Sequence, residues 1–270
     1  MYENSLRFLI PLKENDRFGG ISRLYGQAGL LALNKAHVCV VGVGGVGSWT
    51  VEALARSGVG ALTLVDLDEV CVTNVNRQLQ ALDGSFGKFK VEELKNRISN
   101  IFPSCNVYVR TEFFNSKTSK KILKDGFDFV VDAIDNVQNK VLLISECCLQ
   151  KIPIITSGAA GGRLDGTRVQ VTDLAKTTHD PLLSKVRSSL RKDHDFPRSG
   201  KKMGVRCVFS PESAVYPKKD GTVCGSRSEV NNSESPLKLN CEWGLGSATF
   251  VTGAFGFAVA GEVVRHLTSE

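Results

Sequence analysis

Short apolar runs alternate with helix-like stretches between residues 37 and 157 of this 270-residue chain. Helical spacing of apolar side chains is clearest at Val91, Leu94 and Ile98. Strands that alternate with helices form right-handed βαβ units around a parallel sheet. We therefore predict an α/β fold built on a Rossmann-like, doubly wound and mainly parallel sheet. The predicted strands are residues 37–42, 61–66, 107–109, 127–132, 152–156 and 167–172.

The amino-acid composition of the chain changes near residue 172. Residues 173–206 are rich in basic side chains, and residues 218–238 are rich in Lys, Ser, Asn and Gly, with little to bury. Such a composition predicts a mobile loop at 218–238. We accordingly divide the chain into a domain over residues 1–172 and a C-terminal extension over residues 173–270.

The extension contains one uncharged stretch, Gly244–Gly261, with five glycines. A membrane-spanning helix needs roughly 20 mostly apolar residues, and this stretch is shorter and only weakly hydrophobic. Small residues instead let helices approach closely. We expect a helix buried in the core or in a subunit interface, and no membrane association.

Charge and cysteine usage narrow the class of protein. The chain has 34 basic and 28 acidic side chains, a net charge of +6, which permits a polyanionic partner without requiring one. None of its eight cysteines is spaced as C-x-x-C, so a zinc ribbon is not expected. The first residues do not resemble a secretory signal. We expect a reducing compartment, the cytoplasm by default, or an organelle in a eukaryote.

A glycine-rich loop lies between the first predicted strand and the helix after it. Gly42, Gly44 and Gly47 satisfy G-x-G-x-x-G, in which the backbone approaches a phosphate closely at a helix N-terminus. Asp66 ends the second strand and can accept hydrogen bonds from ribose hydroxyls. On its own this pattern fits a nicotinamide-dependent oxidoreductase, and it is weak evidence for any function.

The segment after Asp66 favours a triphosphate instead. It carries Arg77, and Lys90 follows shortly afterwards. Two cations neutralise charge that develops on the bridging oxygens of a triphosphate. A nicotinamide ring needs an apolar slot, and its binding would not use these two cations. Taken alone, Arg77 also fits the solvated, capped start of a helix, so the combination with the glycine loop carries the interpretation.

Several motifs, in order, resemble those of the ubiquitin-activating-type adenylating enzymes. This family includes the bacterial enzymes that activate the sulfur carriers of thiamin and molybdopterin synthesis. The resemblance covers roughly residues 17–172. The motifs are the glycine loop, the Asp-x-Asp-x-Val-x-x-x-Asn-x-x-Arg-Gln segment 66–78, the Gly-x-x-Lys segment 87–90 and the Asp-x-x-Asp-Asn segment 132–136.

The resemblance implies that ATP and Mg²⁺ bind at these motifs. Asp135 is the implied magnesium ligand, and an arginine of the N-terminal segment, Arg23 or Arg17, is expected near the γ-phosphate. The implied catalytic residues are Arg77, Lys90, Asp135 and Arg23. The residues implied to contact the nucleotide are Gly42, Gly44, Gly45, Gly47, Asp66, Asn74, Arg77, Gln78, Lys90 and Asn136.

Further stretches resemble the tRNA threonylcarbamoyladenosine dehydratase branch of this family. Sulfur-carrier enzymes usually hold two C-x-x-C pairs, which this chain lacks. The branch implies adenylation of the threonyl carboxylate beside the anticodon, attack by the carbamoyl nitrogen and loss of AMP. The stretches that carry the likeness are residues 17–26, 46–49, 171–177, 204–210 and 244–249.

The branch also implies partners. A homodimer is expected, in which an arginine can cross between subunits. A run of basic residues is the candidate tRNA-binding segment, because such a run can track phosphates, although a solvated charged surface is the commoner meaning of one. Its principal members are Arg187, Arg191, Lys192, Lys201 and Lys202.

Related activating enzymes carry a thioester or persulfide on a cysteine, and the resemblance makes Cys241 the candidate reactive cysteine here. A cysteine-desulfurase or sulfur-acceptor system is a separate expected partner. Free cysteines are more often small buried hydrophobic residues.

Three other functions remain open. The chain can adenylate the C-terminal glycine of a ubiquitin-like or sulfur-carrier protein, which predicts pyrophosphate exchange dependent on that protein. It can be a nicotinamide-dependent oxidoreductase, which leaves Arg77, Lys90 and Asp135 without a task. It can be an inactive scaffold, against which the complete set of motif residues argues.

Overall fold

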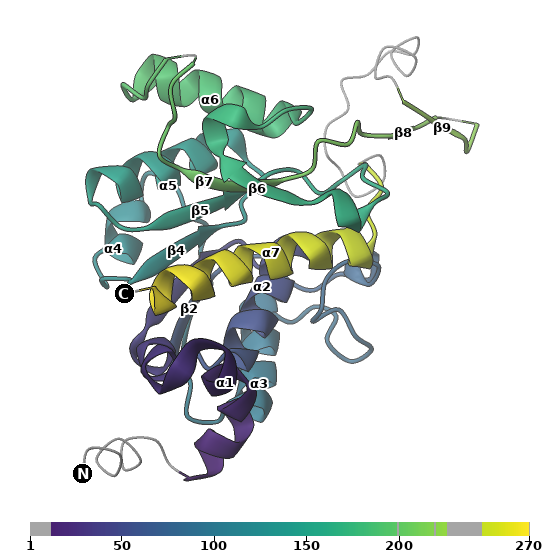
Figure 1. The fold of residues 1–270 in the computed structure, drawn as a ribbon. Helices are drawn as coiled ribbons and strands as arrows, with labels where there is room; N and C mark the ends of the chain where they lie inside the picture. Colours follow the sequence, from purple (N-terminus) through teal and green to yellow (C-terminus); the bar gives the residue numbers. More distant parts are fainter. Residues whose placement is uncertain (1–11, 199, 219, 226–244, 270) are drawn as a thin grey trace.

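The computed structural model describes residues 12–198, 200–218, 220–225 and 245–269 (Figure 1). Its centre is a seven-stranded sheet in the order β3-β2-β1-β4-β5-β7-β6. Neighbouring strands are parallel except β6 and β7, so the predicted mainly parallel sheet is confirmed. The strands are β1 His37–Val41, β2 Ala61–Val65, β3 Asn106–Arg110, β4 Phe129–Asp132, β5 Ile154–Ser157, β6 Gln170–Asp173 and β7 Arg206–Phe209.

Helices cover both faces of the sheet, because alternate residues of each strand point to opposite sides. Val38 and Val40 of β1 pack with α2, α3 and α7, whereas Cys39 and Val41 pack with α4, α5 and α6. This arrangement is the predicted doubly wound fold. The helices are α1 Leu12–Lys35, α2 Gly45–Arg56, α3 Lys90–Ile101, α4 Ser119–Leu123, α5 Val137–Leu149, α6 Pro181–Asp193 and α7 Thr249–Thr268.

Strand order fixes where a ligand site can form. The chain adds β2 and β3 on one side of β1, and β4 and β5 on the other. Ligands of such sheets bind in the crevice outside the carboxyl ends of the strands, at the point where the order reverses. Here that point lies between β1 and β4, beside the glycine loop.

Strand β7 joins the two predicted parts of the chain. It belongs to the predicted extension 173–270, yet it lies between β5 and β6 inside the sheet. The sequence analysis did not predict this strand. The boundary at residue 172 stays a prediction, and the structure shows that residues on both sides of it share one sheet.

Helix α7 covers most of the glycine-rich stretch and buries one of its sides against the rest of the fold. It packs along α2, and a Cβ at Gly256 would lie 2.7 Å from the Cβ of Trp49 and from the carbonyl oxygen of Val46. The absence of a side chain at this position is therefore what lets the two helices approach. None of the helices in the described part of the chain is long and apolar enough to cross a membrane.

The predicted mobile loop at 218–238 is described only in part. Tyr216–Pro217 (β8) pairs with Val223–Cys224 (β9) in a short antiparallel hairpin. Residues 219 and 226–238 of the loop lie outside the described residues.

Candidate nucleotide site at the carboxyl edge of the sheet

The glycine loop follows β1 directly and leads into α2, whose N-terminus faces the crevice. Gly42 has φ +86°, and a Cβ there would lie 2.8 Å from the carbonyl oxygen of Ala133. A Cβ at Gly47 would lie 1.9 Å from the carbonyl oxygen of Gly42. Larger residues do not fit at these positions. The free N–H groups and dipole of the helix end favour an anion such as a phosphate.

Asp66 lies at the carboxyl end of β2 and holds this loop in place. The backbone N–H of Val43 donates to its Oδ2 at 2.8 Å, and that of Asp68 donates to its Oδ1 at 2.9 Å. Burial raises the pKa of the Asp66 carboxyl above its ordinary value, while the Asp68 N–H, the Lys90 ammonium and the Val43 N–H oppose the shift. Its remaining lone pairs are available to ribose hydroxyls.

Lys90 begins α3 and is 5% exposed. Its Nζ lies 2.8 Å from Oδ2 of Asp68, whose side chain is 52% exposed. A buried ammonium beside a solvated carboxylate can exchange that partner for an incoming phosphate. The sequence analysis did not predict Asp68 as the partner of Lys90.

The segment after β2 presents Asn74, Arg77 and Gln78 at the same edge. Nη1 of Arg77 donates to the carbonyl oxygen of Thr73 at 2.6 Å. Oδ1 of Asn74 accepts from the backbone N–H of Cys71 at 3.1 Å, so this side chain shapes the turn. Gln78 is buried, and its Nε2 lies 3.8 Å from a Cβ built on Gly44. The structure therefore brings Arg77 and Gln78 to the glycine loop, while Asn74 shapes the turn before them.

Helix α7 also reaches this segment. The carbonyl oxygen of Arg77 accepts hydrogen bonds from Nε1 of Trp49 and Oγ1 of Thr252, each at 3.2 Å. Thr252 also borders the loop, because its Cγ2 would lie 3.2 Å from a Cβ at Gly45. The sequence analysis did not connect α7 with the nucleotide motifs.

A buried polar cluster at the ends of β4 and β5 completes the edge. Asp132 and Lys140 are fully buried and form an ion pair at 2.8 Å between Oδ2 and Nζ. Thr156 donates to the same carboxylate oxygen at 2.6 Å. The other oxygen of Asp132 accepts from the N–H of Ile134 at 3.1 Å, which fixes the turn that carries Asp135.

The two other members of the 132–136 motif face outwards. Asp135 and Asn136 are exposed, and Oδ1 of Asn136 caps α5 by accepting from the N–H of Asn139 at 3.1 Å. Their roles in metal and nucleotide binding stay predictions.

Residues 20–270 match the ThiF family. The chain belongs to the ThiF family. It is 47% identical over 255 residues to the tRNA threonylcarbamoyladenosine dehydratase of Escherichia coli (strain K12), covering 94% of each chain. Two solved structures of E. coli tRNA N6-threonylcarbamoyladenosine dehydratase, one with ATP and one with AMP, each match with a TM-score of 0.84 at 43% identity over 96% of each chain.

The metal prediction for this ThiF-family chain rests on Asp135 alone. Across residues 12–198, 200–218, 220–225 and 245–269, no group of three or more His, Cys, Asp or Glu side chains is placed to hold a metal. Mg²⁺ in nucleotide sites is commonly bound by one or two carboxylates together with phosphates. An exposed aspartate beside the glycine loop is consistent with that mode.

The predicted arginine of the N-terminal segment does not reach this chain's own glycine loop. A Cβ on Gly19 would lie 3.5 Å from Nη1 of Arg23, so the guanidinium lies along α1. Phe18 next to it packs against Gly58, just past the far end of α2, roughly 18 Å along a twelve-residue helix from Gly45. Arg17 donates to the carbonyl oxygen of Ile101 at 2.9 Å. Arg23 therefore lies away from the glycine loop of its own subunit, and its expected role near the γ-phosphate stays a prediction.

The predicted RNA-binding residues separate into two groups. Arg187 lies in the middle of α6, half-buried, and its Nη1 bonds to the hydroxyl of Thr177. The others lie near the C-terminal end of α6 or just before β7, at the amino edge of the sheet, and are half-buried (Arg191) or exposed (Lys192, Lys201, Lys202).

The candidate reactive cysteine, Cys241, lies outside the described residues. Cys207 lies in β7, and burial raises the pKa of its thiol well above the ordinary value. Cys224 is also buried. A thiol nucleophile must ionise, so Cys207 is not suited to that role.

Proposed function

We propose that this protein is an ATP-dependent tRNA threonylcarbamoyladenosine dehydratase. One observation carries the proposal: a glycine cradle, an acceptor at Asp66 and the cations Arg77 and Lys90 meet at one edge of the sheet. The likeness to the E. coli dehydratase over nearly the whole of both chains supports the substrate. An oxidoreductase would leave the two cations and Asp135 without a task.

The reaction that these residues support is adenylation followed by ring closure. An oxygen of the threonyl carboxylate attacks the α-phosphorus of ATP, and pyrophosphate leaves. The carbamoyl nitrogen then attacks the activated carbonyl carbon within the same nucleoside, gives up its proton, and expels AMP. The net change is loss of one water. A carboxylate nucleophile needs no general base, so positioning and charge neutralisation by Arg77 and Lys90 supply the catalysis.

Asp135 is the residue that we propose holds Mg²⁺ against the phosphates. The ion, when bound, would disperse the charge that grows on the leaving pyrophosphate. Asp132 and Lys140 would act indirectly, because they fix the turn that presents Asp135.

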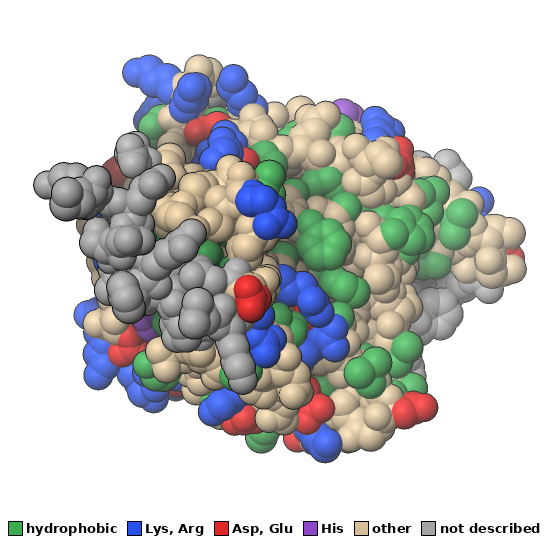
Figure 2. Space-filling model, turned by 60° about the horizontal axis from the view of Figure 1, so that its bottom comes forward, with side chains coloured by type: hydrophobic (Ala, Val, Ile, Leu, Met, Phe, Trp, Pro, Cys, Tyr) green, Lys and Arg blue, Asp and Glu red, His purple; other side chains and the backbone are tan. Residues whose placement is uncertain are grey.

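We propose a homodimer formed with the help of α7. Figure 2 shows hydrophobic side chains gathered on one face of the molecule, beside Lys and Arg side chains. Phe250 and Phe257 of α7 are 66% and 53% exposed, and Leu164 beside Phe250 is 63% exposed. Large exposed apolar side chains of this kind mark interaction surfaces. A second copy would also bring its own Arg23 to this site, because that side chain lies away from the glycine loop of its own subunit.

The tRNA is proposed to lie along α6. Lys192, Lys201 and Lys202 are exposed, and phosphate contacts by these side chains would give salt-sensitive affinity. A cytoplasmic location, a sulfur-transfer partner and a reactive Cys241 stay predictions from the sequence.

The proposed reaction is tested by incubating the protein with ATP, Mg²⁺ and tRNA that carries threonylcarbamoyladenosine. The tRNA is then digested and its nucleosides are weighed. We expect that nucleoside to lose the mass of one water only when ATP is present. Asp135→Ala should abolish the change, whereas Asp193→Ala, which removes an exposed carboxylate at the distant end of α6, should not.

An unchanged nucleoside would contradict the proposal. If pyrophosphate exchange then appeared only on addition of a small carrier protein, the chain would be a carrier-adenylating enzyme.

A further inference from the structure

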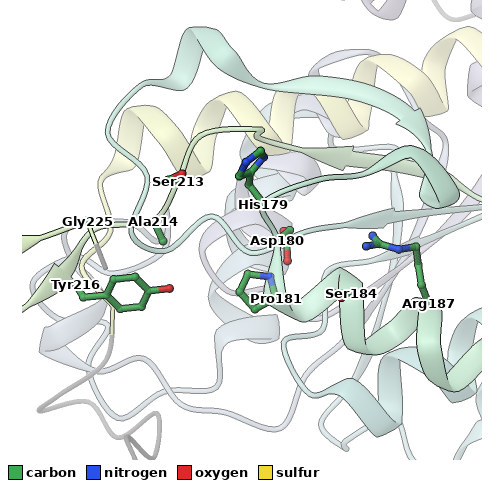
Figure 3. Close-up of a pocket in the computed structure, with 9 residues that line it drawn as sticks. All are labelled: His179, Asp180, Pro181, Ser184, Arg187, Ser213, Ala214, Tyr216 and Gly225. Carbon is green, nitrogen blue, oxygen red and sulfur yellow. The ribbon is translucent and has the colours of Figure 1, made fainter. Parts of the chain in front are cut away.

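A pocket of about 440 Å³ lies beside the nucleotide site (Figure 3). Ser213 and Ala214 line it just beyond the carboxyl end of β7, and Asp180 lines it where its Oδ2 accepts from Ala159 N–H, just beyond β5. The glycine loop follows β1 at the same edge, three strand positions away, which is about 14 Å. A volume of this size suits a ligand as large as a nucleoside.

Buried polar side chains hold the walls of the pocket together. Arg163 is 2% exposed, and its guanidinium bonds to the carbonyl oxygens of His179, at 2.7 Å, and Glu212. His179 precedes α6 and Glu212 follows β7, so one side chain joins two segments that are distant in the sequence. Asp180 caps α6 by accepting from the N–H of Leu183 at 3.0 Å. These hydrogen bonds therefore hold the segment before α6 against the segment after β7 at one side of the pocket.

Arg187 gives this pocket a cation without a carboxylate partner. Among the described residues it forms no ion pair, and its only hydrogen bond from the side chain is to the Thr177 hydroxyl. Burial and then the neighbouring Arg191 lower the pKa of its guanidinium, although Asp180 opposes this. Asp180 itself already accepts two backbone N–H groups. A half-buried guanidinium in this state favours an anion that accepts two parallel hydrogen bonds, as a phosphate does.

Tyr216 supplies an aromatic wall on the other side. Figure 3 shows its ring directed into the pocket, towards Pro181, while the guanidinium of Arg187 points back towards Asp180. The Tyr216 hydroxyl has no hydrogen bond to any residue in the described ranges. Unpaired bases of RNA are recognised by stacking on aromatic side chains, together with polar contacts to the base edge and the backbone.

We propose that this pocket binds the modified adenosine nucleotide of the RNA substrate, with the base against Tyr216 and a backbone phosphate at Arg187. The substituent on the base is then directed along the sheet edge towards the glycine loop. This inference rests on the proposed function for the identity of the nucleotide. It separates Arg187, which binds one nucleotide, from the exposed lysines, which track the backbone.

The test measures binding without turnover. The probe is an anticodon stem-loop RNA that carries threonylcarbamoyladenosine, and a second RNA is abasic at that position. We expect Tyr216→Ala to weaken binding of the first RNA about 10-fold to 100-fold, the range for loss of one stacked base. Tyr216→Phe should stay within about 2-fold, since the ring remains. With the abasic RNA, Tyr216→Ala should change nothing.

Arg187→Ala should weaken the binding of both RNAs. It should also reduce the magnitude of the slope of log affinity against log salt concentration by about 1, the value for loss of one phosphate contact. Lys185→Ala, which removes an exposed cation two residues away on α6, is the matched control and should have a smaller effect. Affinity for ATP should be unchanged in every variant. Thermal melting checks the fold, and Tyr216→Leu replaces Tyr216→Ala if the smaller side chain destabilises the hairpin.

Equal losses for the two RNAs on Tyr216→Ala, or no loss for either, would overturn the proposal. Weakened binding of a carrier protein's C-terminal peptide, with RNA binding unchanged, would assign the pocket to a protein tail and also overturn it. Failure of the proposed function is a separate result, because it is the absence of water loss by the unaltered protein in the turnover assay.

Discussion

The glycine loop and the pocket lined by Tyr216 and Arg187 lie at the same edge of one sheet, but they are constructed differently. Around β1 and β2 the shape is set by backbone, since a side chain at Gly42 or Gly47 would meet a carbonyl oxygen. Around β5 and β7 the shape is set by buried side chains, chiefly Arg163 and Asp180, that join distant segments.

The difference affects which part of a ligand each site recognises and which residues each site requires. A backbone cradle binds what all nucleotides share, the phosphates, and it requires glycine at fixed spacing. A pocket of side chains from separate segments binds what distinguishes one substrate from another. The glycine loop is therefore expected to support adenylation of any carboxylate. The pocket beyond β5 and β7 is expected to select which carboxylate is adenylated.

The largest effect is expected at the junction of the two regions. Lys140→Met removes the partner of the fully buried Asp132. An uncompensated buried charge costs about 3–5 kcal/mol, so the free energy of unfolding should fall by that amount. Chemical denaturation measures it. Adding Asp132→Asn should recover much of the loss. An unchanged stability in Lys140→Met alone would mean that the pair does not join the regions.

Gly47→Ala tests the nucleotide region. The new methyl would meet the carbonyl oxygen of Gly42, so the loop must shift, at a cost of about 3 kcal/mol. ATP affinity, measured by calorimetry, should be lost while RNA affinity remains. Gly261→Ala is the control, because nothing lies within 4 Å of its Cβ position. Equal ATP affinity in the two variants would show that the loop is not a rigid cradle.

Arg163→Met tests the pocket region in the same way. It leaves the carbonyl oxygens of His179 and Glu212 without their donor, which costs about 1–3 kcal/mol. We expect affinity for the stem-loop RNA to fall and ATP affinity to stay unchanged. A parallel loss of both affinities would contradict the separation of the two regions.

The smallest effect concerns the pH dependence of stability at Asp66. Its pKa is raised in the folded state, so the protonated carboxyl stabilises the fold at low pH and this contribution is lost as pH rises through the raised pKa. In ligand-free protein, Asp66→Asn should therefore gain stability relative to the unaltered chain between about pH 4 and pH 7. Thermal melting across that range measures the difference. A trend of opposite sign would show that the two N–H donors outweigh burial.

Much of the fold and of the nucleotide edge could be predicted because local patterns encode them. The spacing of Gly42, Gly44 and Gly47 can be read from the sequence, and it marks positions in a tight turn; at Gly42 and Gly47 a side chain would collide with backbone. Strands β1, β2 and β4 are mostly apolar, and each ends at or beside a motif residue.

Contacts between distant segments could not be predicted in this way. Arg163 lies 49 positions from Glu212, and nothing in the residues between them marks the pair. Strand β7 is only four residues long and follows a basic loop, so its apolar run gave too weak a signal. The location of Arg23 depends on how α1 packs beside Gly58, which no spacing rule reveals.

The most direct test of the account follows the oxygen atoms. The threonyl carboxylate of the tRNA nucleoside is labelled with ¹⁸O, the protein and ATP are added, and the released AMP is weighed. Adenylation followed by ring closure predicts that one labelled oxygen leaves with AMP for each nucleoside that cyclises. Labelled oxygen in inorganic phosphate with ADP as the other product, or unlabelled AMP, would contradict it.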